Sequence, residues 1–91
     1  MANSIQEKIE SGALILDVRT AEEFEDEHYP NARCIPVNEL PHHLGEIPKA
    51  KSIVVYCASG ARSAYAARIL KSAGYVDVVN AGGLADLPRI A

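Results

Sequence analysis

The sequence has no tryptophan, one phenylalanine and only two cysteines among its 91 residues. Two cysteines cannot build a disulfide framework, so a hydrophobic core must hold the chain together. No stretch approaches the roughly 20 apolar residues of a membrane-spanning helix, and we expect no contact with a membrane. The nine basic residues form no cluster and the net charge is −3, which argues against a nucleic-acid partner.

The first residues also lack the pattern of a secretory signal, because no basic segment is followed by an apolar run and a small-residue cleavage site. We therefore expect a cytoplasmic protein whose two cysteines are reduced thiols. Removal of an export signal stays open, since a mature exported protein given a new start methionine would read the same. The length predicts one domain, residues 1–91. We expect a monomer, although the sequence does not determine the oligomeric state.

Short apolar runs alternate with helix signals along the chain. The runs that predict strands cover residues 13–18, 33–37, 52–57 and 77–81. The segments that predict helices are 5–12, 21–27, 38–45, 63–73 and a short one after a turn at 82–83. This alternation predicts an α/β fold with a small, mostly parallel sheet of about five strands and helices on both faces. Such sheets bind ligands at the carboxyl ends of their strands, where Asp17 and Cys57 fall.

Helix starts are indicated by two capping boxes. Ser4 with Glu7, and Thr20 with Glu23, have the spacing in which two side chains satisfy each other's backbone N–H groups.

The segment that carries most chemical information is CASGARS, residues 57–63. A free thiol with a pKa near 8.5 is only about 3% ionised at pH 7. The small residues after Cys57 allow backbone N–H groups to turn toward its sulfur, and the helix that follows directs its N-terminus there. Gly60 can adopt a positive φ, and Arg62 adds a cation with a planar donor fork. We therefore predict a lowered pKa for Cys57, with help from Arg62.

The alternative is a buried cysteine at a strand end, followed by an ordinary turn. The conjunction of apolar strand, cysteine, four small residues, arginine, serine and helix favours a reactive thiol. The loop that would hold its substrate anion consists of Ala58, Ser59, Gly60, Ala61, Arg62 and Ser63.

Asp17 and Arg19 follow the first strand and are candidates for bracing the rim of the site. Arg19 would do so by pairing with Glu22 or Glu23. The competing interpretation is a surface ion pair that contributes little to stability.

The remaining candidates are more ordinary. The histidines do not predict a metal site, since His28 has no second ligand at a suitable spacing and the adjacent His42 and His43 point in different directions. Tyr56 is expected to pack in the core, and Cys34 to be a small buried hydrophobe.

Several motifs together resemble the rhodanese family of single-domain sulfurtransferases, over about Ile5 to Leu87. The matching segments are Cys-x-x-Gly-x-Arg at 57–62, Asp-x-Arg at 17–19, Glu-Glu-Phe at 22–24, a counterpart of Gly-His-Ile-Pro-Gly-Ala at 27–32, and Gly-Gly at 82–83. The ending NAGGLADLP is similar to the small phage-shock type of thiosulfate sulfurtransferase. Glu27 and Asn31 replace two family glycines, Tyr29 replaces an isoleucine, and Leu87 stands where many members carry tryptophan.

The resemblance implies a ping-pong reaction. Cys57 would take the outer sulfur of thiosulfate or a similar donor as a persulfide and pass it to cyanide, a cellular thiol or a protein acceptor. The family needs no metal and no organic cofactor.

Three other functions are alternatives to this one. Phosphatases and arsenate reductases of the same fold family have a Cys-x5-Arg loop, one residue longer than the Cys-x4-Arg spacing of Cys57 and Arg62. Some rhodanese-like domains have lost the cysteine and are interaction modules, which the presence of Cys57 disfavours. The domain could also be a persulfide carrier for one dedicated protein. The physiological donor, acceptor and pathway are not encoded in these motifs.

Overall fold

The computed structural model describes residues 4–89. Its helices are α1 (Ser4–Glu10), α2 (Ala21–Asp26) and α3 (Ala61–Ser72), with the 3-10 turns η1 (Leu40–His42), η2 (Leu44–Glu46) and η3 (Leu84–Asp86). Its strands are β1 (Leu14–Asp17), β2 (Arg33–Cys34), β3 (Ile53–Cys57) and β4 (Val78–Gly83). The four strands pair in parallel in the order β2-β1-β3-β4.

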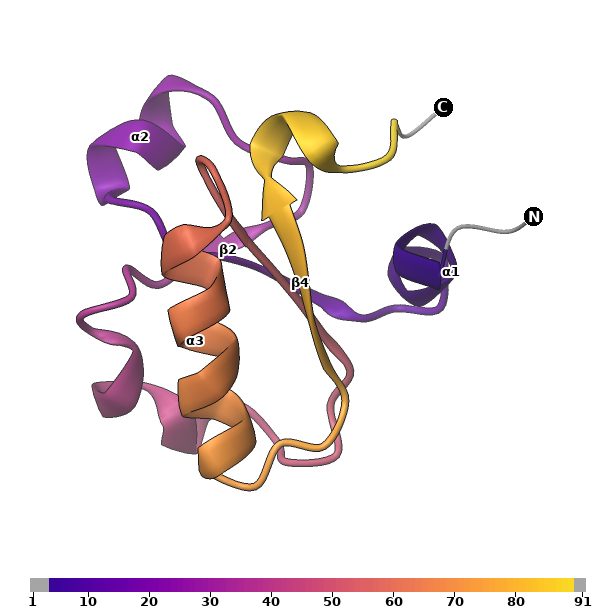
Figure 1. Ribbon diagram of the computed structural model, residues 1–91, viewed down its shortest axis with the longest axis vertical. Coiled ribbons are helices and arrows are strands. Elements are labelled where there is room, and N and C mark those ends of the chain that lie inside the picture. The colour runs from indigo at the N-terminus through magenta and orange to yellow at the C-terminus, as the bar shows by residue number, and fades with distance from the viewer. Residues whose placement is uncertain (1–3, 90–91) are drawn as a thin grey trace.

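The two faces of the sheet are covered by different elements, as the sequence predicts. Alternate side chains of a strand point to opposite faces, so Leu16 and Val55 pack in one apolar cluster with Leu70 of α3, while Ile15 and Val54 pack in the other. Figure 1 shows α3 on one side of the strands and α1 on the other. At the carboxyl ends of the strands, α2 and the yellow turn η3 flank the loop that follows β3 (Figure 1).

The expectation of about five strands is wrong by one for the part of the chain that the structure describes, where the sheet has four. The expected helix at 38–45 is also wrong, since this segment forms the separate turns η1 and η2. Pro41 lies within η1, and its missing N–H prevents a continuous α-helix there.

The double glycine is the third difference. The sequence predicts a turn at Gly82 and Gly83, but both are the last residues of β4. A register shift between Val55 and Cys57 brings Cys57 opposite Gly83. The end of β4 therefore lies beside the start of the CASGARS loop.

Candidate active site

Cys57 ends β3 at the centre of the sheet and is only 1% exposed. The loop after it curls back, so that the backbone N–H of Gly60 donates to the Cys57 sulfur at 2.9 Å. This curl requires φ +106° at Gly60, in the left-handed region that glycine tolerates best. The helix α3 begins at Ala61, two residues earlier than predicted, and its third residue Ser63 places a hydroxyl 3.4 Å from the same sulfur.

These contacts favour the thiolate. Burial raises the pKa of Cys57, but the Ser63 hydroxyl and the backbone N–H groups of Ser63, Gly60 and Ser59 together lower it from 9.0 to about 7. The lowering that the sequence predicts is confirmed. Its strongest single contributor is the Ser63 hydroxyl, which the sequence argument did not single out.

Arg62, and not Arg19, is the partner of Glu23. Its Nη1 and Nη2 atoms donate to Glu23 Oε1 and Oε2 at 2.7 and 3.1 Å. Its pKa is raised first by Glu23 and, more weakly, by Cys57. Arg62 therefore favours the thiolate through its charge, while its hydrogen bonds hold the loop to α2.

A buried polar network lies next to this loop. Asp17 is fully buried and receives hydrogen bonds from Nε and Nη2 of Arg19, whose Nη2 also donates to the Glu27 carbonyl at 2.6 Å. The Tyr56 hydroxyl donates to Asp17 Oδ2 at 2.7 Å and accepts the backbone N–H of Tyr29 at 3.0 Å. The network ties the ends of β1 and β3 to the segment after α2, which is where a brace of the site would act.

One sequence expectation about this network is wrong and one is confirmed. Arg19 does not pair with Glu22 or Glu23 but with Asp17, because a fully buried carboxylate needs a cation more than exposed ones do. Tyr56 does pack in the core, but its hydroxyl also has two polar partners.

Sequence reasoning missed Asn80 altogether. Its Oδ1 lies 2.6 Å from Ser63 Oγ and accepts the N–H of Gly82 at 2.9 Å, while its Nδ2 donates to the Gly60 carbonyl at 3.2 Å. The side chain therefore links β4 to both ends of the curl. No local motif marks this role, since the contact joins residues 17 positions apart.

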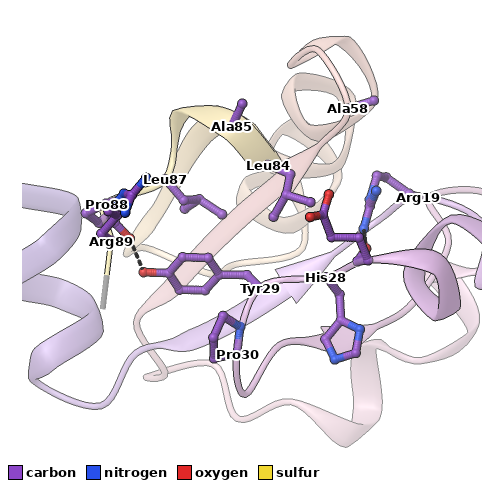
Figure 2. A pocket seen from close by; sticks show the side chains of 11 residues that line it. Arg19, His28, Tyr29, Pro30, Ala58, Leu84, Ala85, Leu87, Pro88 and Arg89 are labelled. Carbon is purple, nitrogen blue, oxygen red and sulfur yellow. Dashed lines mark hydrogen bonds between the residues drawn. The ribbon is translucent and has the colours of Figure 1, made fainter. Parts of the chain in front are cut away.

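A cavity of about 650 Å³ opens beside the loop at Ala58. Tyr29, Leu84 and Leu87 give it apolar walls, and Arg19 contributes to its polar rim. In Figure 2, Arg19 and Ala58 lie at one end and Pro88 with Arg89 at the other, with Tyr29 between them. The Tyr29 hydroxyl donates to the Pro88 carbonyl at 2.5 Å, which holds the chain after η3 against this wall.

The other candidates take ordinary positions. His28 stacks on Phe24 with 3.8 Å between ring centroids, and His43 pairs with Glu46. Within residues 4–89, no three potential ligands gather in a way that would hold a metal ion. Cys34 is half-buried rather than buried, and burial raises its pKa. No helix of the described chain is long and apolar enough to cross a bilayer.

The chain is similar to proteins of one known family. A model of the rhodanese-like domain matches residues 1–86. A sulfurtransferase of Allochromatium vinosum is 40% identical over 70 residues, which are 77% of this chain and 65% of that protein. The thiosulfate sulfurtransferase PspE of Escherichia coli is 39% identical over 74 residues, 79% of this chain and 71% of the relative. The putative sulfur carrier protein YrkF of Bacillus subtilis is 41% identical over 66 residues, 72% of this chain and 36% of the relative.

Solved structures agree. A structure described as a rhodanese with anions from E. coli is 36% identical, with a TM-score of 0.79, and the match covers 84% of this chain and 92% of that one. The family resemblance and the α/β fold predicted from the sequence are confirmed by these matches.

Proposed function

The chain belongs to the rhodanese family, and from this premise we propose that it moves a sulfane sulfur from thiosulfate or a similar donor to a thiophilic acceptor through a persulfide on Cys57. The observation that carries the proposal is the hydrogen-bonding environment of the Cys57 sulfur. Hydrogen bonds from Gly60 and Ser63 hold it and bring its pKa to about 7, so that roughly half of the thiol is ionised at neutral pH.

In the first step, the Cys57 thiolate attacks the outer sulfur of thiosulfate. A new S–S bond forms at Cys57, the S–S bond of thiosulfate breaks, and its electron pair leaves with sulfite. The persulfide carries the negative charge that the thiolate brought. The loop N–H groups that stabilise the thiolate are suited to stabilise this anion in turn.

In the second step, a nucleophilic acceptor attacks the outer sulfur of the persulfide. The S–S bond breaks, its electron pair returns to Cys57, and the thiolate is restored. Splitting one transfer into two displacements is the logic of nucleophilic catalysis, and neither step requires a general base because the nucleophile is already ionised.

The donor anion is assigned to the inner surface of the loop, residues Ala58 to Ser63. Small side chains leave its backbone N–H groups open, and Arg62, whose guanidinium is held by Glu23, adds positive charge at the start of α3. The Asp17 and Arg19 pair is assigned the role of bracing the neighbouring chain, since its hydrogen bonds reach the Glu27 carbonyl.

A protein acceptor is the second candidate, with the domain as a sulfur carrier. One relative is named a putative sulfur carrier, and the cavity beside Ala58, at about 650 Å³, is far larger than a cyanide ion. These two observations favour an acceptor group that enters from the side of Tyr29 and Leu87.

Mass spectrometry of the intact protein tests the proposal. Thiosulfate should add the mass of one sulfur atom to the wild type and to Cys34→Ser, and nothing to Cys57→Ser. With cyanide present, the wild type and Cys34→Ser should both turn over thiosulfate. Neither of them should hydrolyse an aryl phosphate. Loss of turnover in a folded Cys34→Ser variant, or phosphatase turnover comparable to sulfur transfer, would overturn it.

A further inference from the structure

The Ser63 hydroxyl has more acceptors around it than it can satisfy. Its single proton can go to Asn80 Oδ1 at 2.6 Å, the Gly60 carbonyl at 3.1 Å, the Cys57 sulfur at 3.4 Å or the Gly82 carbonyl at 3.4 Å. A hydroxyl donates one hydrogen bond at a time. The shortest of these contacts is to Asn80, so the sulfur must compete for the proton.

The orientation of the Asn80 amide is fixed by its other neighbours. The Gly82 N–H can only donate, so the atom facing it must be Oδ1, at 2.9 Å. The Gly60 carbonyl can only accept, so the atom facing it must be Nδ2, at 3.2 Å. Asn80 therefore presents an acceptor, not a donor, to Ser63, and rotating the amide would break two backbone contacts.

We propose that Asn80 is a positioning residue that competes with the Cys57 sulfur for the Ser63 proton and so restrains ionisation of the thiol. While Cys57 is protonated, Ser63 donates to Asn80. When the thiol ionises, the hydroxyl rotates and donates to the thiolate, giving up its bond to Asn80. The inference rests on the proposed function only in taking Cys57 as the reactive thiol.

Charged groups around the loop also influence the ionisation of Cys57. They are Arg62 of α3, Glu23 of α2, Asp86 of η3, Asp17 at the end of β1 and its partner Arg19. Asp86 accepts the N–H of Gly83 at 2.9 Å, and Glu23 is held by Arg62. All of them are retained when Asn80 alone is replaced, so their influence cancels in a comparison of variants.

The competition has a consequence for reactivity. A thiol attacks fastest when its pKa lies near the ambient pH, because a more acidic thiolate is a weaker nucleophile. Without Asn80, Ser63 would give up only its longer contact to the Gly60 carbonyl, at 3.1 Å, when it donates to the thiolate. Asn80 thus keeps Cys57 from becoming too acidic to attack sulfur well at neutral pH.

The test uses the full chain with Cys34→Ser, so that Cys57 is the only thiol. Ionisation is followed by the ultraviolet absorbance of the thiolate, corrected with the additional Cys57→Ser variant. Asn80→Ala should lower the midpoint by about half to one pH unit, the shift expected for one hydrogen bond. Asn38→Ala, which removes an exposed asparagine from a turn, should leave the midpoint unchanged.

Combination with Ser63→Ala separates this role from a structural one. Ser63→Ala alone should raise the midpoint, and adding Asn80→Ala to it should change nothing further. Asn80→Asp, which keeps an acceptor for Gly82, should raise the midpoint more with Ser63 present than without it. A higher midpoint in Asn80→Ala, or an equal shift in the absence of Ser63, would overturn the proposal. If these shifts occur but thiosulfate leaves no persulfide, the proposed function fails and the role of Asn80 stands.

Discussion

Arg62 and Glu23 form a two-point ion pair, with N···O distances of 2.7 and 3.1 Å, that joins the start of α3 to the first turn of α2. The same carboxylate accepts the backbone N–H of Thr20 and completes the capping box of α2. One side chain thus fixes both the end of the loop and the helix that flanks it. The Arg62 and Glu23 side chains are 38% and 34% exposed, so solvent screens their attraction and the pair contributes more to geometry than to stability.

We predict that Glu23→Gln slows persulfide formation several-fold, while costing less than about 1 kcal/mol of unfolding free energy at pH 7. Hydrogen bonds from Arg62 and then Thr20 lower the pKa of Glu23 from 4.5 to about 2. A lowered carboxyl pKa stabilises the fold above the unfolded value and loses this contribution as the pH falls through the folded value. The unfolding curves of wild type and variant should therefore converge as the pH falls from 4.5 to 2.

Glu22→Gln is the matched control for this prediction. Glu22 is an exposed neighbour on the same helix, and its replacement removes the same charge without touching Arg62. Rapid-mixing measurements of persulfide formation should find this variant equal to the wild type. An equal loss in both variants would mean that the net charge of α2 matters and the ion pair does not.

The sequence carries the local part of this site well. The capping box of Thr20 and Glu23, the buried strand before Cys57 and the curl at Gly60 all follow from residues within a few positions of one another. These features depend on hydrogen bonds that close over short stretches of chain, and such bonds leave recognisable spacings. The rhodanese resemblance adds their order along the chain.

The partners of the polar side chains were the part that could not be predicted. Arg62 meets Glu23 across 39 residues, and Ser63 meets Asn80 across 17. Which strand ends come together depends on the order of strands in the sheet and on their register, and a one-residue shift in register would separate these groups. The buried position of Asp17, which selects Arg19 as its partner, is likewise a property of the packed sheet.

We predict that Tyr56→Phe lowers the free energy of unfolding by about 2–4 kcal/mol. Tyr56 is fully buried, and its hydroxyl serves both Asp17 and the N–H of Tyr29. Without it, a buried N–H and one carboxylate oxygen lose a partner, and each such loss costs about 1–3 kcal/mol. Urea denaturation should show a lower midpoint with an unchanged dependence on denaturant concentration.

Tyr65→Phe removes the same hydroxyl from a side chain on α3 that is 58% exposed. Water solvates that hydroxyl in both the folded and the unfolded chain, so the change should stay within about 0.5 kcal/mol. Similar losses of unfolding free energy in Tyr56→Phe and Tyr65→Phe would show that the hydrogen bonds of the buried Tyr56 hydroxyl contribute nothing beyond the packing of its ring.

The end of β4 packs tightly against the start of the loop. A Cβ added at Gly83 would lie 2.2 Å from the carbonyl oxygen of Ala58, the first residue of the loop. The φ of Gly83 is −97°, which alanine adopts without strain, so the obstacle is purely steric. Gly83→Ala must push the Ala58 peptide away. The backbone N–H groups that follow it in the loop then turn away from the Cys57 sulfur. We expect the pKa of Cys57 to rise toward 9.0, sulfur transfer at neutral pH to fall at least tenfold or so, and stability to drop by about 1–3 kcal/mol.

Gly45→Ala is the control, since a Cβ there meets nothing within 4 Å. Titration of the thiolate and turnover of thiosulfate measure the two effects, and a Gly83→Ala variant with an unshifted Cys57 midpoint would show that the loop holds its shape without this close approach.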